Sequence, residues 1–251
     1  LEFRRVLFRS DVAAARSWPG LAAHYGYPGT TGERLRQKIE AQFHYQPRPD
    51  AQAYADGHAW ELGGGVRVTA HHLPGHTSGH CALVVEPAGV AFIGDIDLTG
   101  FGPYYGDATS NLRDFRSTLR KVADLPATQW VTSHHRGLIS DRATFLQMLD
   151  AFAAKLDERS DKLLGMLQGA PRSLDELVRQ RLLYPPGYAE LWVDDAERRT
   201  ITQHLDELLQ AGAVQTMADG AVTRYARILG FCRCPRAAVR TRVRWMKPER
   251  K

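Results

Sequence analysis

Cysteines and long apolar runs are both scarce in this chain. Only three cysteines occur among 251 residues, Cys81, Cys232 and Cys234, and the last two match no zinc-binding spacing. An odd number this small excludes a disulfide framework. No stretch approaches the roughly 18 uninterrupted apolar residues of a membrane helix, and the amino terminus lacks the apolar core of a secretory signal. We therefore expect a globular, cytoplasmic protein with no membrane partner.

Excess positive charge is confined to the two ends of the chain. The last 21 residues carry eight Lys or Arg against the single acid Glu249, a net charge of +7, and residues 1–10 carry +2. Of the total net charge of +5, this leaves −4 for residues 11–230. The body of the protein is mildly acidic, which disfavours a nucleic-acid partner because a phosphate backbone attracts basic surfaces.

Both ends also have unusual sequences. Residues 1–10, LEFRRVLFRS, read as the translation of a common short-read sequencing adapter and resemble no fold element. We exclude them from the fold and expect the native protein to extend further upstream. Residues 231–251 lack apolar periodicity. They are interpreted either as a basic, disordered tail or as out-of-frame reading after a sequencing error.

Short apolar runs rich in β-branched residues predict strands between residues 59 and 139, namely GVRVTAHHL, HCALVVE, GVAFIGDI and TQWVTSHH. A helix separates the third run from the fourth, with Ser110 as its expected N-cap. Its buried stripe consists of Leu112, Phe115, Leu119 and Val122. Residues 31–43 predict another amphipathic helix. Strands mixed with helices indicate an α/β layer structure.

The pattern becomes helical after Asp141. A long helix with its apolar stripe between Phe145 and Leu167 is followed by a short helix that the capping box SLDE (Ser173–Glu176) opens. A third helix over Asp195–Gln210, with His204 on its surface, precedes a hairpin around an ADG turn. Three helices and a hairpin describe a winged helix, whose third helix can enter a DNA groove. Five acids against two arginines in residues 194–210 disfavour DNA binding here.

Residues that bind metals recur at the ends of successive predicted strands. His76 lies in LPGHTSGH, Asp95 in FIGDIDL, and His134 or His135 in VTSHHRG. A single histidine after a strand is usually structural. Loops at one edge of a sheet converge, however, so side chains far apart in the sequence can meet around one ion. Imidazole and carboxylate are zinc ligands, and their recurrence in this order predicts a metal site.

These segments resemble the second half of the metallo-β-lactamase superfamily. The signature of that family runs H-x-H-x-D-H, P-G-H-T-x-G-H, G-D and a late histidine, and the last three parts stand here as PGHTSGH, GD and SHHRG. The resemblance covers about residues 51–140. It implies that His76 binds one metal, that Asp95 bridges two and holds the catalytic water between them, and that His134, or alternatively His135, binds the second. His80 would support these ligands from behind.

The resemblance also implies a fold and an activity. The fold would be an incomplete αββα sandwich over residues 11–150, followed by an α+β winged-helix domain over residues 151–230. The activity would be hydrolysis, in which a metal-bound water attacks an ester, a thioester or a phosphodiester of a small-molecule or RNA substrate. The parent protein would hold two zinc ions, with other divalent metals as alternatives.

The first part of the signature, H-x-H-x-D-H, is absent, because His24, His44 and His58 stand at other spacings. We expect that this motif was lost with the sequence upstream of Asp11. The hydrolytic activity of the remaining chain would then be impaired. The alternative function is a nucleic-acid-binding winged-helix protein whose α/β region is a non-catalytic scaffold.

A glycine- and aromatic-rich loop, residues 98–107, follows Asp95 directly. Its side chains Phe101, Tyr104 and Tyr105 are expected either to form the floor or lid of the substrate pocket or to pack as ordinary loop residues.

Overall fold

The computed structural model describes residues 6–27 and 29–228. The predictions for the basic tail and for Cys232 and Cys234 therefore lie outside the described residues. Within the described ranges, no helix is both long and apolar enough to cross a membrane.

A six-stranded sheet forms the centre of the first part of the protein, in the order β3-β4-β5-β6-β7-β8. The strands are β3 (Ala59–Glu61), β4 (Arg67–His72), β5 (Cys81–Glu86), β6 (Val90–Phe92), β7 (Gln129–Val131) and β8 (Leu138–Ile139). Only β6 and β7 pair in parallel among these neighbours. A parallel pair needs a long crossover, which here contains a helix. The four strands expected from the apolar runs are confirmed as β4 to β7.

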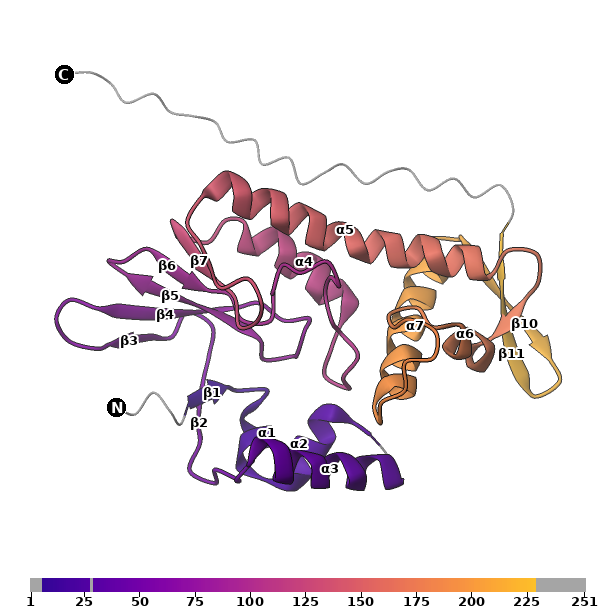
Figure 1. Ribbon diagram of the computed structural model, residues 1–251, viewed down its shortest axis with the longest axis horizontal. Helices are drawn as coiled ribbons and strands as arrows, with labels where there is room; N and C mark the ends of the chain where they lie inside the picture. The colour runs from indigo at the N-terminus through magenta and orange to yellow at the C-terminus, as the bar shows by residue number, and fades with distance from the viewer. Residues whose placement is uncertain (1–5, 28, 229–251) are drawn as a thin grey trace, which may run out of the picture.

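Two helices, α4 (Leu112–Val122) and α5 (Arg142–Met166), cover one face of this sheet (Figure 1). Trp130 of β7 stacks on Phe145 of α5 with ring centroids 4.1 Å apart, and both side chains are fully buried. The expected stripe of α4 is buried as well. Its N-cap, however, is Asn111, whose side chain accepts a hydrogen bond from the Asp114 N–H at 2.9 Å. Ser110 is engaged elsewhere, as described below.

Three short helices form a separate layer, α1 (Val12–Arg16), α2 (Trp18–Tyr25) and α3 (Gly29–Phe43), shown in indigo in Figure 1. Along the chain they connect β1 (Val6–Phe8) to β2 (Gln52–Tyr54), and these two strands pair in parallel. The exclusion of residues 1–10 from the fold is thus wrong for residues 6–8. The apolar triplet Val-Leu-Phe pairs as a strand, and Phe8 is buried against the His72 ring with centroids 3.9 Å apart. That residues 1–10 are translated from a sequencing adapter concerns only their origin, and it stays a prediction.

The second part of the protein has its own small core and shares α5 with the first. It contains β9 (Arg172–Ser173), α6 (Leu174–Gln180), α7 (Val193–Gln210), β10 (Val214–Asp219) and β11 (Val222–Arg227). Its strands form a sheet in the order β10-β11-β9. The capping box at Ser173 and Glu176 is present as expected. The name winged helix stays a prediction.

The domain boundary expected at residue 150 falls inside α5. Phe152 and Leu156 of this helix belong to the core under the large sheet, whereas Leu163 and Leu164 belong to the second core. One continuous helix of 25 residues therefore serves both cores. Its apolar stripe continues through residue 150 because both halves need a buried face.

Candidate metal centre

The Asp95 carboxylate lies between two imidazoles. His76 Nε2 is 3.5 Å from its Oδ2, and His134 Nε2 is 3.1 Å from its Oδ1. The exposed fraction of the side chain rises from 19% for His76 to 35% for Asp95 and 61% for His134, so the cluster opens to solvent on the His134 side. His135 has a positive φ of 63° and its ring centroid is 6.0 Å from that of His134. The structure places His134 against the carboxylate.

Asp95 is held in place by its backbone and by His80. The Asp95 N–H donates to His80 Nε2 at 3.0 Å, and His80 Nδ1–H donates to the Leu73 carbonyl at 3.0 Å. Gly94 makes this contact possible, because its φ is +59° and a Cβ there would lie 2.5 Å from His80 Nε2. Burial, together with the nearby His76, lowers the pKa of His80 to about 4. A neutral His80 with a fixed tautomer therefore supports Asp95 from behind.

His76 is oriented through both its side chain and its backbone. Its Nδ1–H donates to the Tyr104 carbonyl at 3.0 Å, which leaves the Nε2 lone pair facing Asp95. The Ser110 hydroxyl donates to the His76 carbonyl at 2.6 Å, which explains why Ser110 does not cap α4. Gly75 precedes His76 with φ +135°, and a Cβ there would lie 2.4 Å from Phe115 Cα. A histidine whose second ring nitrogen is fixed by a carbonyl is typical of metal ligands.

The loop that supplies the Tyr104 carbonyl is itself fixed by the two long helices α5 and α7. Arg159 of α5 donates to the carbonyls of Phe101, at 2.7 Å, and of Pro103. Two residues of α7 donate to further backbone carbonyls of this loop. Gln203 donates to the Tyr105 carbonyl at 3.2 Å, and Arg199 donates to the Gly106 carbonyl at 3.1 Å. Carbonyls on both sides of Tyr104 are thus held, and the Tyr104 carbonyl itself holds His76.

The aromatic residues of this loop take three different places. Tyr104 borders a cavity, whereas Phe101 is partly exposed and packs near Tyr184 with ring centroids 5.8 Å apart. Tyr105 takes the second of the two expected roles, packing inside the protein, because it is fully buried with its hydroxyl 2.6 Å from His204 Nε2. Its ring belongs to the core and cannot contact a substrate.

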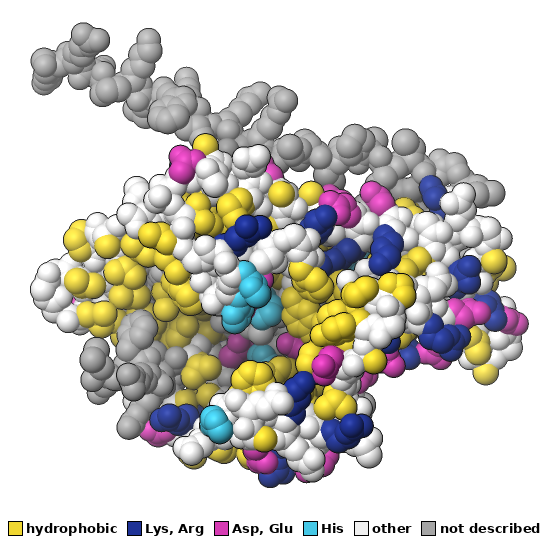
Figure 2. Space-filling view, viewed as in Figure 1, with side chains coloured by type: hydrophobic (Ala, Val, Ile, Leu, Met, Phe, Trp, Pro, Cys, Tyr) yellow, Lys and Arg dark blue, Asp and Glu magenta, His cyan; other side chains and the backbone are white. Residues whose placement is uncertain are grey.

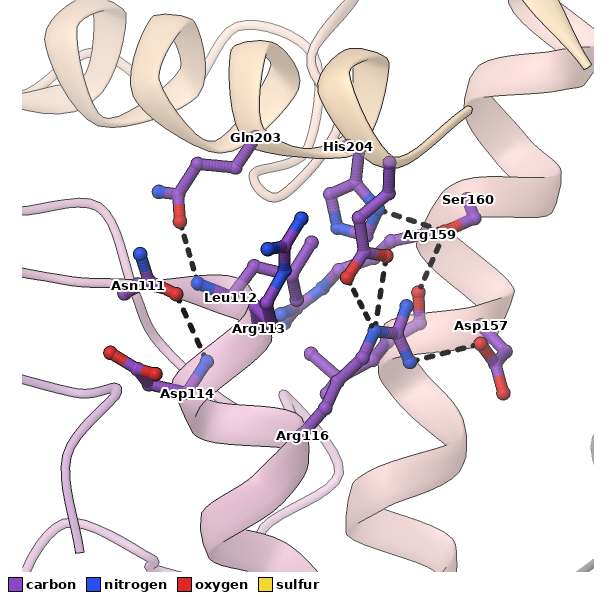
Figure 3. A network of polar contacts seen from close by, with 12 residues as sticks. Asn111, Leu112, Arg113, Asp114, Arg116, Asp157, Arg159, Ser160, Gln203 and His204 are labelled. Atoms are coloured by element: carbon purple, nitrogen blue, oxygen red, sulfur yellow. Dashed lines mark hydrogen bonds and ion pairs between the residues drawn. The ribbon is translucent and has the colours of Figure 1, made fainter. Parts of the chain in front are cut away.

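The prediction that His204 lies on the helix surface is wrong. This residue is fully buried, and its Nδ1 is 2.8 Å from the Ser160 hydroxyl of α5 (Figure 3). The apolar stripe of α7 contained the signal, because His204 follows Ile201 by three positions and precedes Leu208 by four. The residue lies on the buried face that these two define.

Sequence reasoning also missed two carboxylates near the cluster. Asp11 accepts hydrogen bonds from the Thr77 hydroxyl at 2.8 Å and the Ser78 hydroxyl at 3.2 Å, so it fixes the loop that follows His76. Asp107 is buried beside Tyr104. The only sequence signal for Asp107 is a second Gly-Asp pair, which is too frequent to identify a site.

The donor set fits part of a zinc site. Two ligands that are each about 2.1 Å from one tetrahedral ion lie about 3.4 Å apart. Both His–Asp95 separations, 3.5 and 3.1 Å, are close to that value, and each imidazole faces a different carboxylate oxygen. Each pair supplies two donors, whereas zinc takes three or four from the protein. In the part of the chain that the structure describes, no group of three or more His, Cys, Asp or Glu forms a metal site alone.

Comparison with known proteins gives consistent matches. The family model described as metallo-beta-lactamase superfamily matches residues 7–134. A curated relative, an atrochrysone carboxyl ACP thioesterase of Pseudocercospora fijiensis, is 25% identical over 165 residues, which are 66% of this chain and 47% of the relative. This chain thus spans about half the length of that relative.

Two solved structures are similar over most of the chain. A metallo-beta-lactamase family protein from Thermus thermophilus is 27% identical with a TM-score of 0.62, covering 89% of this chain and 71% of that one. A beta-lactamase domain protein from Burkholderia ambifaria is 19% identical with a TM-score of 0.58, covering 89% and 64%. The second likeness bears on the fold alone.

Proposed function

Because the chain belongs to the metallo-β-lactamase superfamily, we propose that it carries part of the active site of a zinc-dependent hydrolase. The residues of this chain that would hold zinc are His76, Asp95 and His134, and the Asp95 carboxylate would be shared between the two imidazole sides. The proposal rests on one observation, that the two oxygens of the Asp95 carboxylate face different imidazoles. Bound zinc would lower the pKa of a bound water towards neutrality and polarise the carbonyl that is attacked.

The residues of this chain have defined parts in such a site. Asp95 presents one carboxylate oxygen to His76 and the other to His134, while the His80 ring fixes the Asp95 backbone. The Tyr104 carbonyl keeps the His76 lone pair aimed at the cluster. Because the H-x-H-x-D-H ligands are absent from the sequence, we expect weak zinc binding and low activity from this chain alone. Upstream loss of that motif stays a prediction.

Among the substrates expected from the motifs, we favour a thioester. The curated relative is named as a thioesterase, and Tyr104, whose carbonyl accepts the hydrogen bond from His76, borders a cavity lined mainly by aromatic and apolar side chains. Other esters and phosphodiesters use the same chemistry, so a panel of substrates must separate them.

The nucleic-acid-binding alternative is not favoured. A recognition helix must present an open face to a groove, yet α7 is packed between α4, α5 and α6. Two of its acids have internal partners: Glu197 accepts hydrogen bonds from the backbone of Leu182 at 2.7 Å, and Glu207 pairs with Arg116 at 3.1 Å. Its remaining acidic side chains would repel a phosphate backbone.

Zinc titration of the full chain tests the assignment of the ligands. Calorimetry at pH 7.5 should show binding that weakens by about 10- to 100-fold or more in His76→Ala and in His134→Ala. His135→Ala is the matched control, since it removes a neighbouring imidazole that does not face Asp95. Equal losses in His134→Ala and His135→Ala, or no loss in His76→Ala, would contradict the proposal.

A further inference from the structure

An aromatic-lined cavity of about 470 Å³ lies between the α2–α3 layer and the loop of residues 98–107. Its lining includes Tyr25, Tyr27, Leu35, Ile39, Tyr104 and Trp192. A second cavity of about 370 Å³ shares several of these residues and extends along α2 and α3. On this face of the molecule, histidine and acidic side chains gather in a recess that hydrophobic side chains surround (Figure 2). Apolar cavities of this size, with a few polar groups, are typical of small-molecule sites.

Tyr104 joins this cavity to the metal cluster. Its carbonyl accepts the hydrogen bond from His76, and its ring centroid is 6.0 Å from that of His76. Its hydroxyl donates to Asp107, and both residues line the cavity. A group that fills the cavity therefore ends one side chain away from His76. That spacing suits a substrate whose apolar part occupies the cavity while its carbonyl reaches the cluster.

The polar end of the cavity is the buried carboxylate of Asp107. Its Oδ1 accepts hydrogen bonds from the hydroxyls of Tyr27 at 3.3 Å and Tyr104 at 3.4 Å. Among the described residues, no hydrogen-bond donor reaches Oδ2. Burial raises the pKa of Asp107, as expected for a carboxylate with too few donors. Asp107 lines the cavity, and a carboxylate oxygen without a donor of its own is a strong acceptor for a donor on the occupant.

We propose that this cavity binds the acyl part of the substrate, an aromatic or alkyl group that carries a hydroxyl or amino donor for Asp107 Oδ2. The assignment of an acyl group rests on the proposed hydrolase function. Binding in the cavity requires no metal, because none of the lining residues is a proposed ligand. The two proposals can therefore fail separately.

Calorimetry on the full chain with EDTA present tests this site, with 2-naphthol and 2-methoxynaphthalene as probes. The two differ in one hydrogen-bond donor, and a bond to a charged acceptor predicts that 2-naphthol binds about 10-fold more tightly. Asp107→Asn should reduce that preference to about twofold, because it keeps the side-chain shape and removes the charge. Leu35→Trp, which fills the cavity, should abolish binding of both probes.

Two further variants keep the test decisive. If Leu35→Trp lowers the circular dichroism of the folded protein, Leu21→Trp fills the same cavity from α2. Leu138→Ala on β8 alters an exposed apolar side chain that lines neither cavity, and should leave both affinities unchanged. Equal affinity of the wild-type chain for the two probes, or binding that survives cavity filling, overturns the proposal. Probe binding without zinc binding would overturn the hydrolase proposal instead.

Discussion

Arg159 on α5 fixes the loop that orients His76, so its replacement by methionine measures how much the carboxy-terminal helices support the site. Arg159 as a whole is 6% exposed, and its guanidinium donates to the carbonyls of Phe101 and Pro103 and, at 3.2 Å, to the Tyr105 hydroxyl. Methionine retains much of the apolar stem and removes all three donors. Each buried acceptor left without a donor costs about 1–3 kcal/mol. Allowing for partial relaxation, we expect the free energy of unfolding to fall by about 3–5 kcal/mol.

Urea denaturation followed by circular dichroism measures this loss, and zinc titration measures its consequence for His76. Since the loop on the amino-terminal side of Tyr104 would lose its hydrogen bonds, the Tyr104 carbonyl would be held less firmly and zinc affinity should fall by about 10-fold. Arg198→Met is the control, because Arg198 is 45% exposed and its pair with Asp175 is a surface ion pair worth less than about 1 kcal/mol. If Arg159→Met and Arg198→Met unfold at the same urea concentration, the supporting role of Arg159 is refuted.

Two further predictions concern buried ionisable groups. Glu197 is fully buried and accepts hydrogen bonds from the backbone N–H groups of Leu182, Leu183 and Tyr184. Glu197→Gln turns an amide donor towards these N–H groups, so the free energy of unfolding measured in urea should fall by about 2–4 kcal/mol. A loss below about 0.5 kcal/mol would contradict this. Because the pKa of His80 is about 4 in the folded state and 6.5 otherwise, the unfolded chain binds the proton first as the pH falls. The free energy of unfolding of the zinc-free protein should therefore fall by about 3 kcal/mol between pH 6.5 and pH 4 because of this residue. In His80→Gln, the free energy of unfolding measured in urea should depend less steeply on pH.

The strands and helices were predictable because their signals are local. Apolar runs of β-branched residues became β4 to β7, and the spacing of Leu112, Phe115 and Leu119 became the buried face of α4. The pattern of metal-binding residues could be predicted for a related reason. His76 and Asp95 follow strand ends, and strand ends at one edge of a sheet meet in space.

What could not be predicted depends on contacts between distant segments. The environment of His204 is set by Tyr105, 99 positions away, and by Ser160, 44 positions away. Likewise Asp107 meets Tyr27 across 80 positions. Nothing in a short stretch of sequence distinguishes such a buried polar residue from a surface one, except its place on an apolar stripe. The position of residue 150 inside α5 could not be read from the sequence either, because a helix shared by two cores shows no break in its pattern.

The segment after residue 150 supports the proposed metal site, because its side chains hold the loop of residues 98–107. The Arg116 guanidinium of α4 lies between Asp157 of α5, at 3.0 Å, and Glu207 of α7, at 3.1 Å (Figure 3). These pairs join α4 to α5 and α7, the two helices whose side chains hold the loop of residues 98–107. A chain cut at residue 150 would leave Arg116 without both partners and would free the carbonyls beside Tyr104. The orientation of His76 therefore depends on a helix that ends 134 residues further along the chain, at Gln210. Such dependence is expected where a loop is fixed by buried hydrogen bonds instead of by its own secondary structure.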